Sequence, residues 1–419
     1  MFTLSRIKNR FHYAWLIMVG CCFLQAGAAG ILLGCAGVFV PPICSELGFG
    51  VGQLSVYFTI FQITTIISMP FVGKLLPKLN IRILMSICFL ICTGSVALMS
   101  QFTALWQWYI AGAVMGLAGA FVFLVPATVL INNWFQKNTG FALGFTMAFS
   151  GVSGIFFNPL EAYFITTFGW RTTYLIMAGI STLMVLPFTL FVFRFKPADM
   201  GLKPYGYNED GTATCTAASS LPGVPADKAI KSFSFVMMFL LAGFIAFPCG
   251  FNQHMPTFAS SIGKTPAFGA LLVSAIMIGN IVSKLVIGWL ADKIGIFKVA
   301  LLCIMTAAAV CLGLIGSQNS ATMLLVLCVL LGITNGMTAV GIPLLVRSLF
   351  GNKDYTAIYT YISMGLFLVN AFGVTIIGFI YDSTGNYNPT FILGTVVCII
   401  AILLLILAFA GKKRLAWEG

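Results

Sequence analysis

Long apolar stretches alternate with short polar segments along the whole of this 419-residue chain. A helix needs roughly 20 mostly apolar residues to cross the hydrocarbon core of a bilayer, and twelve stretches of that order are present. They cover residues 14–40, 53–73, 82–100, 105–131, 140–163, 172–194, 233–258, 267–291, 298–316, 321–346, 356–381 and 389–410. The first, fourth and tenth are long, which predicts tilted helices or projecting helix ends. The pattern predicts an all-α membrane protein with twelve transmembrane helices.

The composition excludes a soluble protein. Hydrophobic residues make up 60% of the chain and charged residues only 8%, whereas soluble domains carry roughly 25% charged residues. The bilayer must therefore be the solvent for most of the chain, with backbone polar groups paired inside helices. The twelve cysteines show no metal or disulfide spacing, and a cysteine within a span acts as a small apolar residue. We expect neither a metal nor a cofactor.

The net charge of +12 fits a membrane protein better than a nucleic-acid binder. If the N-terminus is cytoplasmic, 19 of the 22 Lys and Arg residues fall on the cytoplasmic side of the predicted spans. Arg171 and Lys264 fall outside, and Lys284 lies within a span. Cytoplasmic loops of membrane proteins carry such an excess. We expect a multi-pass plasma-membrane protein (inner membrane in a Gram-negative cell) with both termini cytoplasmic and no nucleic-acid partner.

One polar segment divides the chain in two. Residues 195–232 are rich in Pro, Gly, Ser, Thr and Ala, which is the composition of a linker. The segment follows the sixth apolar stretch and precedes the seventh. We therefore predict an N-terminal six-helix bundle over residues 1–194, a cytoplasmic linker, and a C-terminal six-helix bundle over residues 233–419.

The two halves repeat one another. Gly73-Lys-Leu-Leu-Pro-Lys78-Leu-Asn-Ile-Arg82 lies between the second and third stretches, and Gly288-Trp-Leu-Ala-Asp292-Lys293-Ile-Gly-Ile-Phe-Lys298 lies 215 residues later, between the eighth and ninth. Val125-Pro126 similarly corresponds to Ile342-Pro343, which lies 217 residues later. Several matches at nearly one offset indicate duplication. The sequence therefore predicts two bundles related by pseudo-two-fold symmetry, which is a common build of secondary transporters.

Lys284 is the one Lys or Arg that lies deep within a predicted span rather than at its end. It precedes Asp292, at the expected cytoplasmic lip, by eight residues, or roughly 12 Å of helix. Its α-carbon is thus expected near the inner side of the midplane, where a charge costs at least ~2.5 kcal/mol and marks a functional pathway. Asn280 and Gly288 lie one turn to either side, on the same face. This narrow polar face suits an anion.

Two other interpretations of Lys284 stay open at this point. The side chain can snorkel to the cytoplasmic interface, or it can form a packing ion pair with a carboxylate elsewhere in the protein.

Further polar and aromatic residues in the spans complete the set of candidates. For substrate binding they are Lys284, Asn280, His254, Phe123, Asn335 and Tyr361. For proton coupling they are Glu161, His254 and Lys284, because each carries a titratable group within or near a span. The competing interpretation is that polar side chains in spans hydrogen-bond neighbouring helices and that aromatic ones pack.

The repeated loop, the twelve stretches and the central linker resemble the major facilitator superfamily. The family's gating loop corresponds here to Gly73, Lys78 and Arg82 in the first half and to Gly288, Asp292 and Lys293 in the second. The first copy departs from the motif, with Pro77 in place of the acid and Asn80 in place of the glycine. This resemblance implies transport by alternating access.

Within that superfamily the chain resembles the monocarboxylate porters and the oxalate–formate exchangers. The resemblance rests on Asn133-Trp-Phe-Gln-Lys137-Asn-Thr-Gly140-Phe-Ala-Leu-Gly144, on Met147-Ala-Phe-Ser-Gly-Val-Ser-Gly154, and on Asn280-Ile-Val-Ser-Lys284-Leu-Val-Ile-Gly288. It implies that the basic residue at Lys284 binds the substrate carboxylate, with Asn280 beside it. Dicarboxylate exchangers of this group use a second lysine where Leu366 stands here, so a monoanion is the expected substrate.

We therefore expect a secondary active transporter of small organic monocarboxylates that works as a monomer and is not an enzyme. The chain carries no nucleotide-binding motif, so transport must draw on gradients or exchange. Proton symport is the first expectation. Carboxylate:carboxylate exchange of the oxalate–formate type, efflux of other organic anions and facilitated diffusion are the alternatives.

Overall fold

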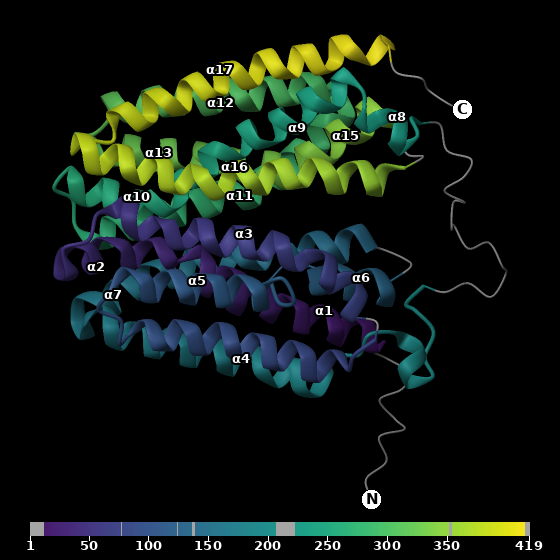
Figure 1. The fold of residues 1–419 in the computed structure, drawn as a ribbon, viewed down its shortest axis with the longest axis horizontal. Coiled ribbons are helices and arrows are strands. Elements are labelled where there is room, and N and C mark those ends of the chain that lie inside the picture. The colour runs from purple at the N-terminus through teal and green to yellow at the C-terminus, as the bar shows by residue number, and fades with distance from the viewer. Residues whose placement is uncertain are drawn as a thin grey trace, which may run out of the picture. The chain divides into compact units, whose positions relative to one another are not determined.

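The structure is a computed structural model that describes residues 12–76, 78–123, 125–135, 139–206, 223–351 and 354–414. Within these ranges all regular structure is helical, apart from two isolated β-bridges, as Figure 1 shows. Pro77 and the motif residues 136–138, Lys137 among them, lie outside the described ranges. The predicted all-α architecture is confirmed.

Ten helices within the described residues are long and apolar enough to cross a membrane. One of them, Phe141–Val192, is 52 residues long and covers two predicted spans. Its parent helix α7 (Thr139–Pro187) turns at Gly169, whose φ of 77° is not helical. The predicted fourth span is present as two shorter helices, α5 (Leu105–Gly119) and α6 (Val125–Trp134). The multi-pass character that the sequence predicted is thus confirmed.

Backbone contacts divide the chain into two compact units. Unit 1 contains residues 1–36 and 64–213, and unit 2 contains residues 37–63 and 214–419. This division differs from the sequence-based boundary at one place. The segment Gly37–Ile63, which the repeat assigns to the first half, makes its contacts with the second.

Unit 1 is built from the helices of the first half (Figure 1). They are α1 (Tyr13–Leu24), the π-helix η2 (Gln25–Gly34), the second half of α3 (Val51–Leu75), α4 (Ile81–Met99), α5, α6, α7, a second π-helix η4 (Phe188–Val192) and the 3₁₀ turn η5 (Pro197–Met200). Large side chains such as Phe89, Trp108 and Trp134 are completely buried between them. The exposed apolar residues of these helices suit contact with lipid.

Unit 2 contains the helices of the second half, the C-terminal end of span 1 and the N-terminal part of span 2 (Figure 1). They are η3 (Ala36–Phe39), α2 (Val40–Leu47), the first half of α3, α8 (Ala226–Ile230), α9 (Phe233–Ala246), η7 (Phe247–Gly250), α10 (Phe251–Ser261), α11 (Pro266–Ile294), α12 (Ile296–Gly316), α13 (Ala321–Leu331), α14 (Ile333–Gly336), η8 (Met337–Gly341), α15 (Ile342–Phe350), α16 (Tyr355–Thr384), α17 (Asn388–Ala410) and η9 (Gly411–Arg414). One apolar cluster from α9, α12, α15, α16 and α17 forms its core.

Four spans lose regular α-helical geometry near their middle. Span 1 changes to the π-helix η2, and span 4 has a turn over residues 120–123. Span 7 contains the 3₁₀ turn η7, which starts at Phe247-Pro248, and span 10 passes through α14 and the π-helix η8. These are the first and fourth spans of each half, so the interruptions follow the sequence repeat. The length of the first, fourth and tenth stretches, which the sequence attributed to tilt, therefore includes an interruption in each span.

Hydroxyl side chains satisfy backbone groups along the π-helix η2. Ser153 on α7 donates to the carbonyl of Ala26 over 2.8 Å, and Ser181 on α7 donates to the carbonyl of Gly27 over 2.9 Å. Each unpaired carbonyl would cost several kcal/mol in lipid, about 4–8 kcal/mol on the cyclohexane scale. The serines of α7 therefore allow span 1 to deviate from α geometry within the membrane.

The two described ends of the linker attach to equivalent loops. Tyr205 forms a parallel bridge with Phe135, after α6, and Gly223 forms an antiparallel bridge with Gly351, after α15. The amide of Val224 donates to the carbonyl of Phe350 over 2.8 Å. Phe135 and Gly351 are related by the same sequence offset as the repeat. Each unit thus holds its own end of the linker through the loop that follows its fourth span.

Candidate functional site

Interrupted helices indicate where a membrane protein binds polar ligands. Non-helical backbone at membrane depth is tolerated where it is buried in protein or lines a cavity, and interrupted helices form the binding sites of many transporters. Gln25 and Phe123 lie at the interruptions of unit 1, and Asn252 and Asn335 lie at those of unit 2. The predicted residues Phe123 and Asn335 are therefore at positions where binding chemistry is expected.

Lys284 lies in the last third of α11, the helix that runs from Pro266 to Ile294. Its side chain is half-buried. Among the described residues it has neither a hydrogen bond nor an ion pair. A packing ion pair, one of the alternatives left open by the sequence, thus finds no carboxylate partner in the described part of the chain. A lysine held within a span without a counter-ion suits an anionic ligand.

Glycines bring α11 and span 10 into backbone contact beside this lysine. A β-carbon on Gly279 would lie within 1.8 Å of the carbonyl oxygen of Val329, and one on Gly332 would lie 2.5 Å from the amide nitrogen of Asn280. The hydroxyl of Ser283 donates to the carbonyl of Gly332 over 3.3 Å. Small residues permit such close approach in a membrane. At this crossing, the side of α11 that carries Asn280 lies next to the interrupted part of span 10.

Replacing Gly279 by alanine should destabilise unit 2 severely. The new methyl group would overlap the Val329 carbonyl, and because backbone must move to make room, we expect a loss of about 3 kcal/mol or more. Gly288→Ala on the same helix is the matched control, since a β-carbon there meets nothing within 4 Å. Thermal unfolding of the purified variants in detergent measures the difference. Equal melting temperatures would contradict the close crossing.

Carboxamide groups gather around this crossing. Asn252 on α10 donates from Nδ2 to Oδ1 of Asn335 on α14 over 3.1 Å. The remaining polar atoms, Oδ1 of Asn252 and Nδ2 of Asn335, are buried and have no partner among the described residues. The same holds for Oδ1 of Asn280, which is 8% exposed. Buried amide atoms without partners are costly, so their presence next to a lysine indicates a site that a polar ligand completes.

His254 is placed differently from the other candidates. Its Nε2 lies 2.7 Å from the carbonyl oxygen of Val374 on α16, and its Nδ1 lies 3.2 Å from the hydroxyl of Tyr387. A carbonyl only accepts, so Nε2 carries the proton and Nδ1 accepts from Tyr387. The ring is 1% exposed. Both nitrogens therefore join α10 to α16 and to the start of α17, and neither is available to a substrate in this conformation.

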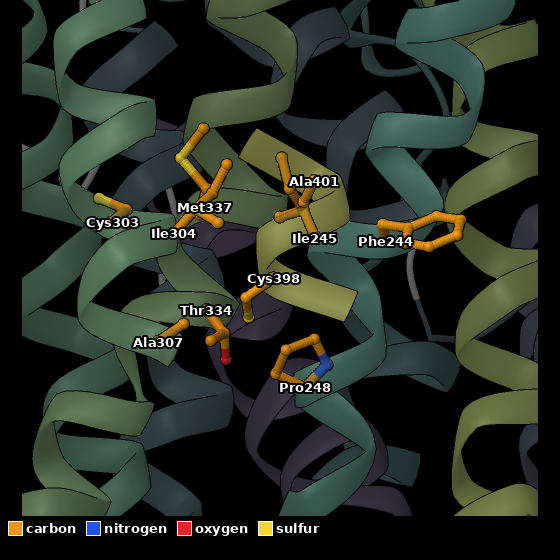
Figure 2. Close-up of a pocket in the computed structure, with 10 residues that line it drawn as sticks. All are labelled: Phe244, Ile245, Pro248, Cys303, Ile304, Ala307, Thr334, Met337, Cys398 and Ala401. Carbon is orange, nitrogen blue, oxygen red and sulfur yellow. The ribbon is translucent and has the colours of Figure 1, made fainter. Parts of the chain in front are cut away.

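A small pocket also lies within unit 2, as Figure 2 shows. It is lined by Phe244, Ile245, Pro248, Cys303, Ile304, Ala307, Thr334, Met337, Cys398 and Ala401. Its volume is about 10 Å³, which is scarcely the space that one water molecule needs. Its apolar lining and size exclude an organic anion, so the pocket is a packing defect beside the interruptions of spans 7 and 10.

One carboxyl group is buried in the described part of unit 1, that of Glu161 on α7. The side chain is 1% exposed, and its Oε2 has no hydrogen-bond partner among the described residues. Cys35 and Tyr174 are near enough to interact with it electrostatically, and neither is basic. The buried Oδ1 of Asn158, one turn earlier, also lacks a partner. A buried carboxyl group without a compensating partner is unusual in a span and marks Glu161 as a candidate functional group.

The other candidates of the first half have structural contacts. Phe123 is 4% exposed, and its carbonyl accepts a hydrogen bond from Nε2 of Gln25 over 2.9 Å. This bond joins the interruption of span 4 to that of span 1. Gln25 is 2% exposed. Its position at the start of η2 could have been recognised only from the helix geometry.

Tyr361 and the gating-loop residues do not belong to the buried polar groups of either unit. Tyr361 on α16 is 48% exposed. In the second-half loop, Asp292 and Lys293 are exposed, and Nζ of Lys293 lies 4.0 Å from the centre of the Trp289 ring. In the first-half loop, Lys78 is exposed and the amide of Arg82 donates to Oδ1 of Asn80, which caps α4. The surroundings of Gly73 lie outside what is described.

These features define a class of protein before any comparison is made. A bundle of membrane-crossing helices, with interruptions repeated in both halves and a lysine beside one of them that has no counter-ion among the described residues, is typical of a solute transporter. No group of three or more His, Cys, Asp or Glu side chains in the described ranges could hold a metal ion.

Comparison with known families agrees with this class. The Major Facilitator Superfamily profile matches residues 22–269 and 250–418, and the chain belongs to that superfamily of transporters.

Among curated relatives, monocarboxylate transporter 12 of Rattus norvegicus is 22% identical, covering 96% of this chain and 86% of the relative. Monocarboxylate transporter 13 of the same species is also 22% identical, covering 91% and 85%. The uncharacterized MFS-type transporter YhjX of Escherichia coli is 22% identical, covering 84% and 85%. These relatives support the predicted resemblance to monocarboxylate transporters.

Solved structures of the same superfamily share the fold. A bacterial homolog of the human lysosomal transporter Spinster aligns with a TM-score of 0.72 at 14% identity, covering 97% of this chain and 99% of that one. The nucleoside transporter NupG aligns with a TM-score of 0.70 at 16% identity, covering 96% and 99%. Because both identities are so low, the likeness concerns the fold alone.

Proposed function

We propose that the protein is a secondary active transporter of small organic monocarboxylates, built as two six-helix bundles that alternate access to Lys284. The observation that carries the proposal is the environment of this lysine. Its ammonium group lies within a span, has no partner among the described residues, and follows Asn280 by one helical turn. A bound carboxylate would neutralise the lysine and receive hydrogen bonds from it, which offsets the cost of keeping the charge in the membrane.

The charge of the site favours a monoanion. On α16, the position at which dicarboxylate exchangers are expected to carry a second lysine is Leu366, which packs against the apolar core of unit 2. A second carboxylate would then be desolvated without a counter-ion, at a cost of several kcal/mol. The printed names of two relatives, monocarboxylate transporters 12 and 13, support the same substrate class. Asn280 and Asn335 are the proposed neutral ligands.

Proton symport is the proposed mode of coupling, with Glu161 as the group that carries the proton. Its carboxyl is buried and uncompensated in unit 1, so it can bind and release a proton without competition from a nearby cation. His254 is the weaker candidate, because both of its nitrogens join helices. Uptake should rise as the external pH falls.

Carboxylate exchange is the second candidate, and one observation favours it. Lys284 has no carboxylate partner among the described residues, so the empty transporter would have to move an uncompensated charge. If that step is slow, a substrate must be bound in each direction, and transport becomes exchange.

Orientation and gating follow from the same proposal. Both termini are assigned to the cytoplasm of a plasma membrane, and a single chain is the functional unit. The loop with Gly73, Lys78 and Arg82 and the loop with Gly288, Asp292 and Lys293 are the proposed gating loops on that side. Asp292 and Lys293 are exposed, as is required of groups that make and break contacts during a cycle.

Uptake into proteoliposomes tests the substrate class. We expect saturable uptake of labelled pyruvate and at least roughly tenfold weaker uptake of malonate, because its second carboxylate would be unpaired. The two acids have the same number of carbon atoms, so size is matched. A thermal-shift screen of lactate, pyruvate, formate, branched-chain and aromatic acids identifies the preferred ligand. Equal uptake of both acids, or stabilisation by none of the monocarboxylates, would exclude this function.

A further inference from the structure

Three segments of unit 1 meet at one end of the unit: the start of α1, the start of α4 and the end of η4. The hydroxyl of Tyr13 on α1 donates to the carbonyl of Val192 in η4 over 2.7 Å. The hydroxyl of Ser86 on α4 donates to Oγ1 of Thr189 in η4 over 2.9 Å. By the distribution of positive charge, this end is assigned to the cytoplasm. The junction brings together two arginines, one from each side of it.

Arg194, just after η4, is held in a fixed position. The indole Nε1 of Trp134 on α6 donates to the carbonyl of Arg194 over 2.9 Å, and Nδ2 of Asn133 donates to the next carbonyl along the chain over 3.0 Å. Nη1 of Arg194 itself donates to the carbonyls of Phe191 and Phe193 over 3.2 and 2.9 Å. Its Nε and Nη2 have no partner among the described residues. The guanidinium group is therefore oriented by the protein and keeps donors for a ligand.

Arg82, the second residue of α4, belongs to the same cluster. Both Arg82 and Arg194 are near enough to the hydroxyl of Tyr13 to interact with it electrostatically. The guanidinium of Arg82 has no hydrogen bond or ion pair among the described residues. The described acids of unit 1 do not neutralise the pair, since Glu161 is buried in α7 and Asp199 accepts an amide of its own turn. Two cations that share one neighbour favour an anion between them.

The elements that carry the arginines also present an apolar surface. Ile83 and Ile87 on α4 are 58% and 52% exposed, and Leu190 and Phe191 in η4 are 40% and 73% exposed. Exposed apolar side chains of a span suit contact with lipid chains. A ligand with an anionic head and apolar tails would match both the arginines and this surface, whereas a soluble anion would match only the arginines.

We propose that Arg82 and Arg194 bind the phosphate of an anionic phospholipid, whose acyl chains lie along Ile83, Ile87 and Phe191. The planar guanidinium fork fits phosphate oxygens with two parallel hydrogen bonds, and anionic lipids are attracted to basic groups at the cytoplasmic surface. The bound lipid would tie the start of span 3 to the end of span 6, where η4 departs from α geometry. This site is separate from transport, because none of its groups contacts the proposed substrate.

Native mass spectrometry of the purified, delipidated chain tests the site. The protein is titrated with dioleoyl phosphatidylglycerol or with dioleoyl phosphatidylcholine. The two lipids share the phosphate and the acyl chains, but choline adds a cation that the arginines repel. We expect the first phosphatidylglycerol to bind at least roughly tenfold more tightly than phosphatidylcholine. Equal affinities for the two lipids would overturn the proposal.

Variants locate the bound lipid. Arg82→Gln should weaken phosphatidylglycerol binding roughly fivefold and the double variant with Arg194→Gln roughly 25-fold, because each basic residue near an anionic surface contributes about that much. Lys298→Gln is the matched control. Lys298 is exposed at the start of α12, the counterpart of α4 in the repeat, and its loss should not change the affinity. An equal loss in the control would overturn the site in favour of diffuse surface charge.

Two further measurements exclude a folding defect and a soluble ligand. Arg82→Gln should melt at the wild-type temperature in phosphatidylcholine nanodiscs and gain less stability than the wild type from phosphatidylglycerol. Inorganic phosphate in large molar excess should not displace the lipid, because it leaves the apolar surface unused. Displacement by phosphate, or equal stabilisation of variant and wild type by phosphatidylglycerol, would overturn the lipid site. No carboxylate is present in these assays, so failure of the proposed transport function would not affect their outcome.

Discussion

Replacing Lys284 by alanine should abolish monocarboxylate uptake. The ammonium group is the one cation of α11 before Lys293 in its last turn, and it has no partner among the described residues. Removing one member of a buried ion pair costs about 3–5 kcal/mol, which corresponds to a loss of roughly 100-fold or more in affinity. Uptake by proteoliposomes, with equal amounts of protein inserted, measures the effect. Normal uptake by the alanine variant would remove Lys284 from the site.

Two companion variants separate binding from folding. Lys284→Arg keeps the charge and offers two parallel hydrogen bonds to a carboxylate, so it should retain transport. Lys284→Met keeps the length of the side chain and removes an uncompensated charge from the span, so it should be inactive and at least as heat-stable as the wild-type protein. Inactivity combined with a raised melting temperature is the pattern expected of a ligand-binding charge. A fall in both activity and stability would instead indicate a packing role.

The hydrophobic pattern predicted the helices, and the distribution of charge singled out Lys284 as a candidate. Both inferences depend on the energetics of single residues in lipid. Every predicted apolar stretch contains helix within the described residues. The lysine was found from the same reasoning, since a charge at membrane depth is costly wherever its neighbours lie. That Lys284 has no counter-ion among the described residues could be seen only in the structure, because the sequence cannot show which carboxylate of another helix lies nearby.

Properties that depend on contacts between helices could not be predicted. The interruptions of spans 1, 4, 7 and 10 are stabilised by groups far away in the sequence, such as Ser153 and Ser181 on α7 for the π-helix η2. His254 looked like a substrate or proton ligand, yet Val374 and Tyr387 occupy its two nitrogens. In each case the decisive partner lies more than 100 residues away, where the hydrophobic period carries no information.

The grouping of Gly37–Ile63 with unit 2 also depends on contacts between helices, so the sequence could not predict it. Duplication assigns this segment to the first half, as the repeat predicted, but the contacts of a transporter change during its cycle whereas its sequence does not. Glycine at Gly52 and Gly378 was compatible with helix packing in general. Only the coordinates show that each faces the other across two halves of the repeat. A sequence repeat therefore shows which segments arose together by duplication, whereas the contacts show which segments pack together in one conformation.

Replacing Glu161 by glutamine should uncouple transport from the proton gradient. Glutamine has nearly the same shape but cannot bind and release a proton, and the buried carboxyl of Glu161 has no cation to compensate it among the described residues. For electroneutral symport of one proton with one monoanion, each pH unit supports about tenfold accumulation, since one unit corresponds to about 1.4 kcal/mol. Vesicles with an inward gradient of about two pH units should thus accumulate substrate up to roughly 100-fold with the wild-type protein.

The variant should lose this accumulation and keep exchange. With Glu161→Gln we expect an internal concentration no higher than the external one, while labelled internal substrate still exchanges with unlabelled substrate outside, because Lys284 lies in the other unit and is unchanged. Glu161→Asp retains a titratable carboxyl and should restore part of the accumulation, which a merely structural role for the side chain would not explain. Full accumulation by the glutamine variant would place the proton on another group. A wild-type protein that exchanges but never accumulates would instead identify the exchange mechanism, in which the protonated Glu161 is a neutral part of the core of unit 1.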